Sequence, residues 1–195
     1  TCYMNSALQI IVNSTVLTKV MLSNNFKSNK LNIYKNFLQQ YRTGNSYSPK
    51  DVKDMVGGKD SKFLDFNQHD SHEFLINLME LLEDEFKNEY KVNNIEILNI
   101  PLNNLMSTIF DTTVSSIIYS EETKEKSKTK IGERILSVPI PQKENVTLND
   151  CLDYYTQIEK LTGDSKWRSE KNKKLVDAYK SCLLYTSDAA DDKQC

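Results

Sequence analysis

Apolar residues recur at intervals of three and four along the first part of the chain, which is the period of an amphipathic helix. The pattern predicts a helix at the N-terminus, helices over about 30–41 and 48–56, and a long helix from about 70 to 87. The apolar stripes of the first and last of these helices are Met4, Ala7, Leu8, Ile11 and Val12, and Phe74, Leu75, Leu78, Leu81, Leu82 and Phe86. Such stripes are typical of helices that pack on a shared core.

The pattern changes from about residue 105, where β-branched residues become frequent. "STIFDTTVSSIIYS" at 107–120 predicts a strand, "IGERILSVPIP" at 131–141 predicts a second that ends at its prolines, and "KKLVDAYKSCLLY" at 173–185 predicts a further one. A helical lobe followed by a mostly β lobe is an α+β fold.

Two segments between these strands have a different character. "EETKEKSKTK" at 121–130 is highly charged, so we expect a turn or loop there. "TLNDCLDYYTQIEKL" at 147–161 predicts a helix, because Thr147 can cap it and Asp150 follows three residues later, as in a capping box. We interpret Cys151, inside this helix, as a core residue.

Composition limits the class of protein. A chain of 195 residues suits one domain, or one domain with two lobes. The 25 basic and 27 acidic residues give a formal charge of −2, which argues against a dedicated nucleic-acid binder and gives no reason to expect membrane attraction. The longest apolar runs are too short to span a bilayer, and no secretory signal pattern is present.

The four cysteines lie far apart and form no CxxC pair, which is typical of free thiols in a reducing compartment, so we expect a cytoplasmic or nuclear protein. Cys2 has a distinctive position at the start of the first predicted helix. Backbone N–H groups and the positive end of the helix dipole favour a thiolate there. The alternative is a small buried residue that packs at a helix start.

Four ordered segments resemble the ubiquitin-specific proteases, a papain-like cysteine protease family. "TCYMNSALQ" at 1–9 resembles the nucleophile box of that family, and "QHDSHEFL" at 68–75 resembles its second box. The third match has the residue spacing of the fingers subdomain of that family, and it consists of Phe110, Val114, Ser116, Ile118 and "LSVPIP". The fourth match is the stretch that follows, with "TLNDCLDYY", "EKLTGDSKW" and "KKLVDAYK". The resemblance extends from residue 1 to about 180.

The resemblance implies a papain-like fold and a division of the chain. The helical thumb, with the nucleophile box, would cover 1–104, and β-rich fingers would cover 105–182. The palm would be largely missing from these residues. The small and acidic segment 183–195 departs from the family pattern, so we expect a tail that is not native to it.

The resemblance also implies a reaction: hydrolysis of the peptide or isopeptide bond after the C-terminal glycine of ubiquitin. Cys2 would be the nucleophile, Gln68 and Asp70 would bind the ubiquitin tail, and Glu73 would help directly or by holding that loop. The residues themselves leave a capping arrangement open, with Asp70 at the N-cap and Glu73 reaching back to it. The two roles are compatible.

The two histidines, His69 and His72, are spaced so that they share a helix face, but no further ligands complete a metal site. In the resembled family the catalytic base lies in a later Gly-His-Tyr box, which nothing here matches, and an asparagine of the oxyanion hole precedes the nucleophile. By this resemblance, both would fall outside these 195 residues. We therefore expect the chain by itself to be inactive, although its parent is a protease.

The resembled fingers often hold zinc through two CxxC pairs, and here the corresponding residues are Ser120, Thr123, Ser169 and Asn172. Hydroxyl and amide groups are poor zinc ligands beside thiolates, so we expect no metal and no cofactor. The expected partners are ubiquitin or ubiquitinated proteins, with no nucleic acid and no membrane. A non-catalytic ubiquitin-binding module, or a helical scaffold unrelated to ubiquitin, are the alternative interpretations.

Overall fold

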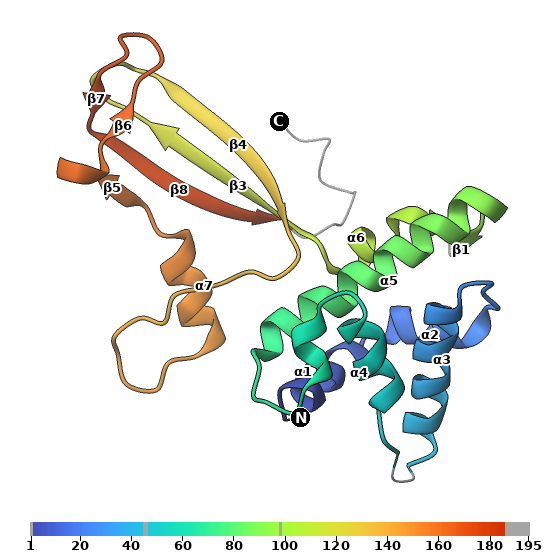
Figure 1. The fold of residues 1–195 in the computed structure, drawn as a ribbon. Helices are drawn as coiled ribbons and strands as arrows, with labels where there is room; N and C mark the ends of the chain where they lie inside the picture. The colour runs from blue at the N-terminus through green and yellow to red at the C-terminus, as the bar shows by residue number, and fades with distance from the viewer. Residues whose placement is uncertain (1, 45–46, 98, 186–195) are drawn as a thin grey trace. The chain divides into compact units, whose positions relative to one another are not determined.

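The computed structural model describes residues 2–44, 47–97 and 99–185, and the chain divides into two compact units, Thr1–Ile109 and Phe110–Cys195 (Figure 1). The first unit is built from helices and the second from an antiparallel sheet. The predicted α+β class is therefore confirmed.

The first unit contains the helices that the apolar pattern predicted, with additional short elements. Its α-helices and 3-10 helices are α1 (Cys2–Val12), α2 (Thr15–Ser23), α3 (Asn29–Arg42), α4 (Lys50–Gly57), η1 (Ser61–Leu64), α5 (Ser71–Asn93), η2 (Leu102–Asn104) and α6 (Leu105–Phe110). Two short antiparallel strands, β1 (Glu96–Ile97) and β2 (Ile100–Pro101), follow α5.

Helix α5 carries the core of this unit. Its stripe residues Phe74, Leu78, Leu82 and Phe86 are completely buried, and α1 packs against it. The helix continues past the expected end at 87 to Asn93. The extension includes a buried carboxylate, Glu89, which accepts a hydrogen bond from the backbone N–H of Ser28 and is therefore compatible with the core.

The second unit is a four-stranded antiparallel sheet in the order β4-β3-β8-β5 (Figure 1). Its strands are β3 (Thr112–Tyr119), β4 (Lys126–Glu133), β5 (Glu159–Leu161) and β8 (Ala178–Tyr185). Helix α7 (Leu148–Thr156) packs against β8. The remaining elements are η3 (Gly163–Ser165) and a small antiparallel pair, β6 (Trp167–Arg168) and β7 (Leu175–Val176).

Several predicted boundaries in this half are wrong, three of them at the strands β3 and β4. The strand expected over 107–120 begins only at Thr112, because the buried residues Leu105 and Met106 belong to the short helix α6. The charged segment 121–130 is not all turn, since β4 begins at Lys126.

The third boundary concerns the strand expected over 131–141, which ends at Glu133. The next residue, Arg134, donates from Nε to Asp111 Oδ1 at 2.7 Å. Asp111 directly precedes β3, so the pairing of β3 with β4 ends at this ion pair. The predicted helix over 147–161 is present with its Thr147–Asp150 capping box, but it ends at Thr156.

Strand β8 also corrects the expected tail. Leu183, Leu184 and Tyr185 pair in register with Ser115, Val114 and Thr113 of β3, so they belong to the sheet. The expected boundary at 183 is therefore too early. Residues 186–195 lie outside the described part of the chain.

Two truncations test this correction. A chain that ends at Cys182 should unfold at a lower urea concentration than a chain that ends at Tyr185, because it loses three residues of β8 that pair with the central strand β3. The chain that ends at Tyr185 should match the full chain, because the removed sequence "TSDAADDKQC" offers little apolar surface. Equal midpoints for both truncations would contradict the assignment of 183–185 to the sheet.

Among the described residues, no single helix is long and apolar enough to cross a membrane. Helices α1 and α2 together meet the criteria of length and composition, but they are bent by 82° at their junction.

Candidate active site

Cys2 and Gln68 lie together although they are 66 positions apart in sequence. Cys2 is the first residue of α1, its side chain is exposed, and its Sγ lies 3.1 Å from Gln68 Oε1. Gln68 lies on the loop just before α5, and α1 packs against α5. This packing brings the two predicted boxes into one site.

Asp70 is the N-cap of α5, as the pattern predicted. Its carboxylate accepts hydrogen bonds from the backbone N–H groups of His72 at 2.7 Å and Glu73 at 3.0 Å. These bonds, that from Glu73 first, hold the pKa of Asp70 below its usual value. Asp70 is therefore charged at neutral pH and fixed at the mouth of the helix.

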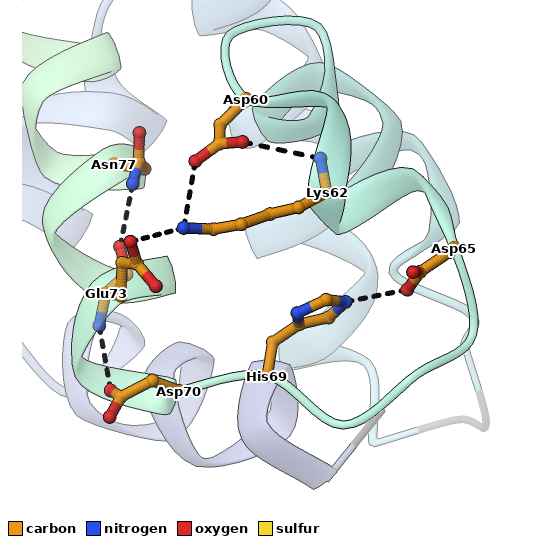
Figure 2. A network of polar contacts seen from close by, with 7 residues as sticks. All are labelled: Asp60, Lys62, Asp65, His69, Asp70, Glu73 and Asn77. Atoms are coloured by element: carbon orange, nitrogen blue, oxygen red, sulfur yellow. Dashed lines mark hydrogen bonds and ion pairs between the residues drawn. The ribbon is translucent and has the colours of Figure 1, made fainter.

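The other half of the predicted capping arrangement is wrong. Glu73 does not reach back to Asp70 but forms an ion pair with Lys62 (Figure 2). Lys62 also contacts Asp60 Oδ2 at 3.1 Å, so its ammonium group lies between two carboxylates. Glu73 therefore connects α5 to η1, and the loop between these elements is held at both ends.

His69 anchors the middle of the same loop. Its Nε2 lies 2.6 Å from Asp65 Oδ1 (Figure 2). Its ring meets Tyr3 and Phe63 edge-on at centroid distances of 5.3 and 5.4 Å. The hydrogen bond to His69 is the main reason why the pKa of Asp65 lies below its usual value. Within the described residues, no three His, Cys, Asp or Glu side chains are grouped as a metal site.

Lys53 of α4 fixes the start of the loop. This buried side chain donates from Nζ to the carbonyl oxygens of Leu64, at 3.3 Å, and of Asp65. Its ammonium group also lies 4.5 Å from the centroid of the Phe66 ring, which is 91% exposed. Sequence reasoning missed the roles of Lys53, Lys62 and Asp65, because these residues have no spacing that relates them to Cys2.

The second unit contains the four residues that correspond, by the resemblance, to the zinc ligands often found in the fingers of that family. Ser120 and Ser169 are completely buried, and Ser120 Oγ donates to the Asp177 carbonyl oxygen at 2.9 Å. Ser169 Oγ donates to Glu125, whose other carboxylate oxygen accepts from the backbone N–H of Lys171 at 3.0 Å. The Glu125 carboxylate therefore joins the turn after β3 to the turn after β6.

We expect this carboxylate, and not a metal, to hold the two turns together. Chelation by EDTA should leave the melting temperature, followed by Trp167 fluorescence, unchanged, whereas Glu125→Ala should lower it relative to Glu121→Ala. The hydrogen bond from the Ser169 hydroxyl is the main reason why the pKa of Glu125 in the folded chain lies below its usual value. Glu125 therefore stabilises the fold fully above the usual pKa of a glutamate, and this stabilisation is lost as the pH falls through the lower pKa of the folded state. About one zinc per chain by elemental analysis, with melting lowered by EDTA, would contradict this prediction.

The chain is similar to known proteins over most of its length. The family model described as "Ubiquitin carboxyl-terminal hydrolase" matches residues 1–186, which include Cys2, Gln68, the whole first unit and most of the second. The chain belongs to the ubiquitin carboxyl-terminal hydrolase family. The resemblance stated from the motifs is therefore confirmed, and the α+β structure is consistent with the papain-like fold of this family.

Three curated relatives agree with this assignment. The chain is 25% identical to "Probable ubiquitin carboxyl-terminal hydrolase 16" of Schizosaccharomyces pombe, over 95% of this chain and 42% of that protein. It is 26% identical to "Ubiquitin carboxyl-terminal hydrolase 4" of Vanderwaltozyma polyspora, over 94% of this chain and 26% of that protein. "Ubiquitin carboxyl-terminal hydrolase Usp2" of Drosophila melanogaster is 26% identical over 84% of this chain and 20% of that protein. The chain thus spans less than half of each of these relatives.

Proposed function

We propose that this chain is part of a deubiquitinating thiol protease and that Cys2 is its nucleophile. The observation that carries the proposal is the contact between Cys2 Sγ and Gln68 Oε1, in a chain of this family. An exposed thiol at a helix start, beside the Gln68 amide, is accessible to a substrate carbonyl.

In the proposed reaction, the Cys2 thiolate attacks the carbonyl carbon of the terminal glycine of ubiquitin. A bond forms between Sγ and this carbon, and the bond from the carbon to the amine nitrogen breaks as that nitrogen takes up a proton. Water then hydrolyses the thioester, which releases the ubiquitin carboxylate and restores the thiol. The Gln68 amide lies beside the attacking sulfur, where it is placed to contact the reacting carbonyl group.

Asp70 and Glu73 would hold the extended ubiquitin tail. Both carboxylates are exposed at the start of α5, on the same loop and helix turn as Gln68. Asp70 is fixed by two backbone N–H groups, and Glu73 by Lys62. Rigid carboxylates suit a tail that carries basic side chains or free backbone N–H groups, since little side-chain entropy is lost on binding.

A ubiquitin derivative with an electrophile in place of its terminal glycine tests the proposal without requiring turnover. The full chain should form a covalent adduct at Cys2, detected by mass spectrometry, and Cys2→Ser should form none. Cys182→Ser, which removes a half-buried thiol of β8, is the matched control and should react like the unchanged chain. Labelling of Cys182 or Cys151 at a rate similar to Cys2 would overturn the proposal.

A non-catalytic ubiquitin-binding module is the alternative, and Asp70 variants address the binding that both interpretations require. Asp70→Asn should reduce capture of the chain on ubiquitin beads, because it removes the charge. It should preserve stability, because asparagine caps helices about as well as aspartate. Asp70→Ala should reduce both capture and stability. Undiminished capture by the Asp70→Asn chain, with its circular dichroism unchanged, would show that the Asp70 charge does not bind ubiquitin.

A further inference from the structure

One face of the four-stranded sheet carries lysines and tyrosines and no carboxylate. In antiparallel pairs, residues directly opposite each other share a face of the sheet. The register therefore places Lys126 of β4, Tyr119 of β3, Tyr179 of β8 and Lys160 of β5 in one row across the sheet. Lys128, Lys130 and Tyr185 lie on the same face because they are even numbers of residues from this row. These seven residues form the lysine–tyrosine face.

The side chains of this face are available to a partner. Its four lysines are exposed, and within the described residues none of them forms an ion pair. Tyr119 and Tyr185 are 36% and 41% exposed. Two lysines flank tyrosine rings, with Lys130 Nζ and Lys160 Nζ each 5.9 Å from the centroids of Tyr185 and Tyr179.

The opposite face has a different environment. It carries Cys182, the acidic residues Glu133 and Glu159, and one lysine, Lys180, which lies directly opposite Glu159. Helix α7 packs against β8, the strand that carries Cys182. The two faces therefore differ in charge, since the first carries four lysines and no carboxylate and the second carries two carboxylates and one lysine.

Lysines on an edge strand also discourage edge-to-edge association, and this role would explain those of β4. It would also explain Lys160, because β5 is the other edge strand, but it does not explain the three tyrosines, which lie on the two central strands. An acidic strand that extended the sheet beside β4 would likewise leave these tyrosines unused. An occupant that lies flat across the face, with regular negative charges and planar groups, uses all seven residues.

We propose that the lysine–tyrosine face binds single-stranded nucleic acid. Phosphates would contact the lysines of β4, which repeat every second residue along an extended strand, and bases would stack on the tyrosine rings. The chain has a formal charge of −2, so its overall charge conceals this local positive surface. The proposal goes beyond hydrolysis at Cys2 and uses none of its residues.

Fluorescence anisotropy with a labelled single-stranded RNA of about 12 nucleotides, and with the matching DNA, tests the proposal on the full chain. Binding should be saturable at about 50 mM salt and should weaken with salt by a slope of about −0.7 per lysine engaged. The triple variant Lys126→Gln, Lys128→Gln, Lys130→Gln should lose about ten-fold or more in affinity and should show a shallower salt dependence.

The matched control is Lys19→Gln, Lys87→Gln, Lys91→Gln, which removes the same charge from exposed positions of the helical unit. Its affinity should stay within about two-fold of the unchanged chain, because these lysines lie outside the face. Tyr119→Ala should weaken binding by about five-fold or more, and Tyr119→Phe should restore it, since stacking needs the ring and not the hydroxyl. Circular dichroism verifies that each variant is folded.

Two results would overturn the proposal. Equal losses in the two lysine triples would show that binding follows overall charge and not this face. Stronger binding of poly-glutamate than of either oligonucleotide, abolished by the β4 triple, would identify an acidic polypeptide as the occupant.

Discussion

The 195-residue chain should hydrolyse a fluorogenic ubiquitin C-terminal substrate at a rate near the uncatalysed background. Its sequence contains two histidines, and no histidine follows His72. A general base typically contributes a factor of about 10²–10⁴, and an oxyanion-hole donor contributes about 10²–10³. The resemblance implies that the family supplies both from residues for which we expect no counterpart among these 195, so the expected loss is large even if the two contributions only partly add.

The hydrogen bonds of His69 and of Cys2 support this expectation. His69 Nε2 is bonded to Asp65, and its ring is packed against Tyr3 and Phe63. The hydrogen-bond partner of the Cys2 thiol is Gln68 and not a histidine. We therefore expect His69 to hold the loop beside the nucleophile and not to remove its proton.

The assay compares the unchanged chain with Cys2→Ser, His69→Gln and His72→Gln. All four should show the same background rate, whereas only Cys2→Ser should lose reaction with the electrophilic ubiquitin derivative. Robust turnover that disappears in both Cys2→Ser and His69→Gln would identify His69 as the base and would contradict the role given to it here.

Helices with one buried face were predictable from the sequence, because burial imposes a period on the residue pattern. Helix α5 illustrates this, since its stripe from Phe74 to Phe86 marks the core directly. Strand β4 was not predictable in this way. All eight of its residues are exposed or only half-buried, and they are largely polar, so neither of its faces produces an apolar alternation.

The candidate site was predictable only in part, for a related reason. Asp70 as N-cap depends on local chemistry, and it was correctly predicted from the residues that follow it. The contact of Cys2 with Gln68 joins residues 66 positions apart, so no spacing predicts it, and only the family resemblance related the two residues to one reaction. The bonds of Glu73 to Lys62 and of Glu125 to Ser169 depend on tertiary packing, which single-sequence patterns do not encode.

The aromatic cluster beneath the site provides the second large expected effect, and Phe63 is at its centre. The Phe63 side chain is completely buried, and its ring contacts Tyr3, His69 and Phe74 at centroid distances of 6.0, 5.4 and 5.2 Å. These neighbours come from α1, from the Gln68 loop and from α5. Phe63 thus joins the three segments that form the candidate site.

Phe63→Ala should lower the free energy of unfolding of the helical unit by about 3–5 kcal/mol, the usual cost of replacing a buried phenylalanine by alanine. Phe66→Ala is the matched control, three residues away and 91% exposed, and it should change that free energy by less than about 0.5 kcal/mol. Far-UV circular dichroism in urea reports mainly on the helices, and Trp167, the single tryptophan, reports on the sheet unit.

Phe63→Ala should therefore shift the circular dichroism transition to lower urea and leave the Trp167 fluorescence transition in place. It should also slow the reaction of Cys2 with the electrophilic ubiquitin derivative at urea concentrations where the helices are still folded, because the Gln68 loop loses its support. A shift of both transitions by the same amount would show that the two units unfold as one cooperative body. Equal effects of Phe63→Ala and Phe66→Ala on the circular dichroism transition would contradict the role of this ring as the centre of the cluster.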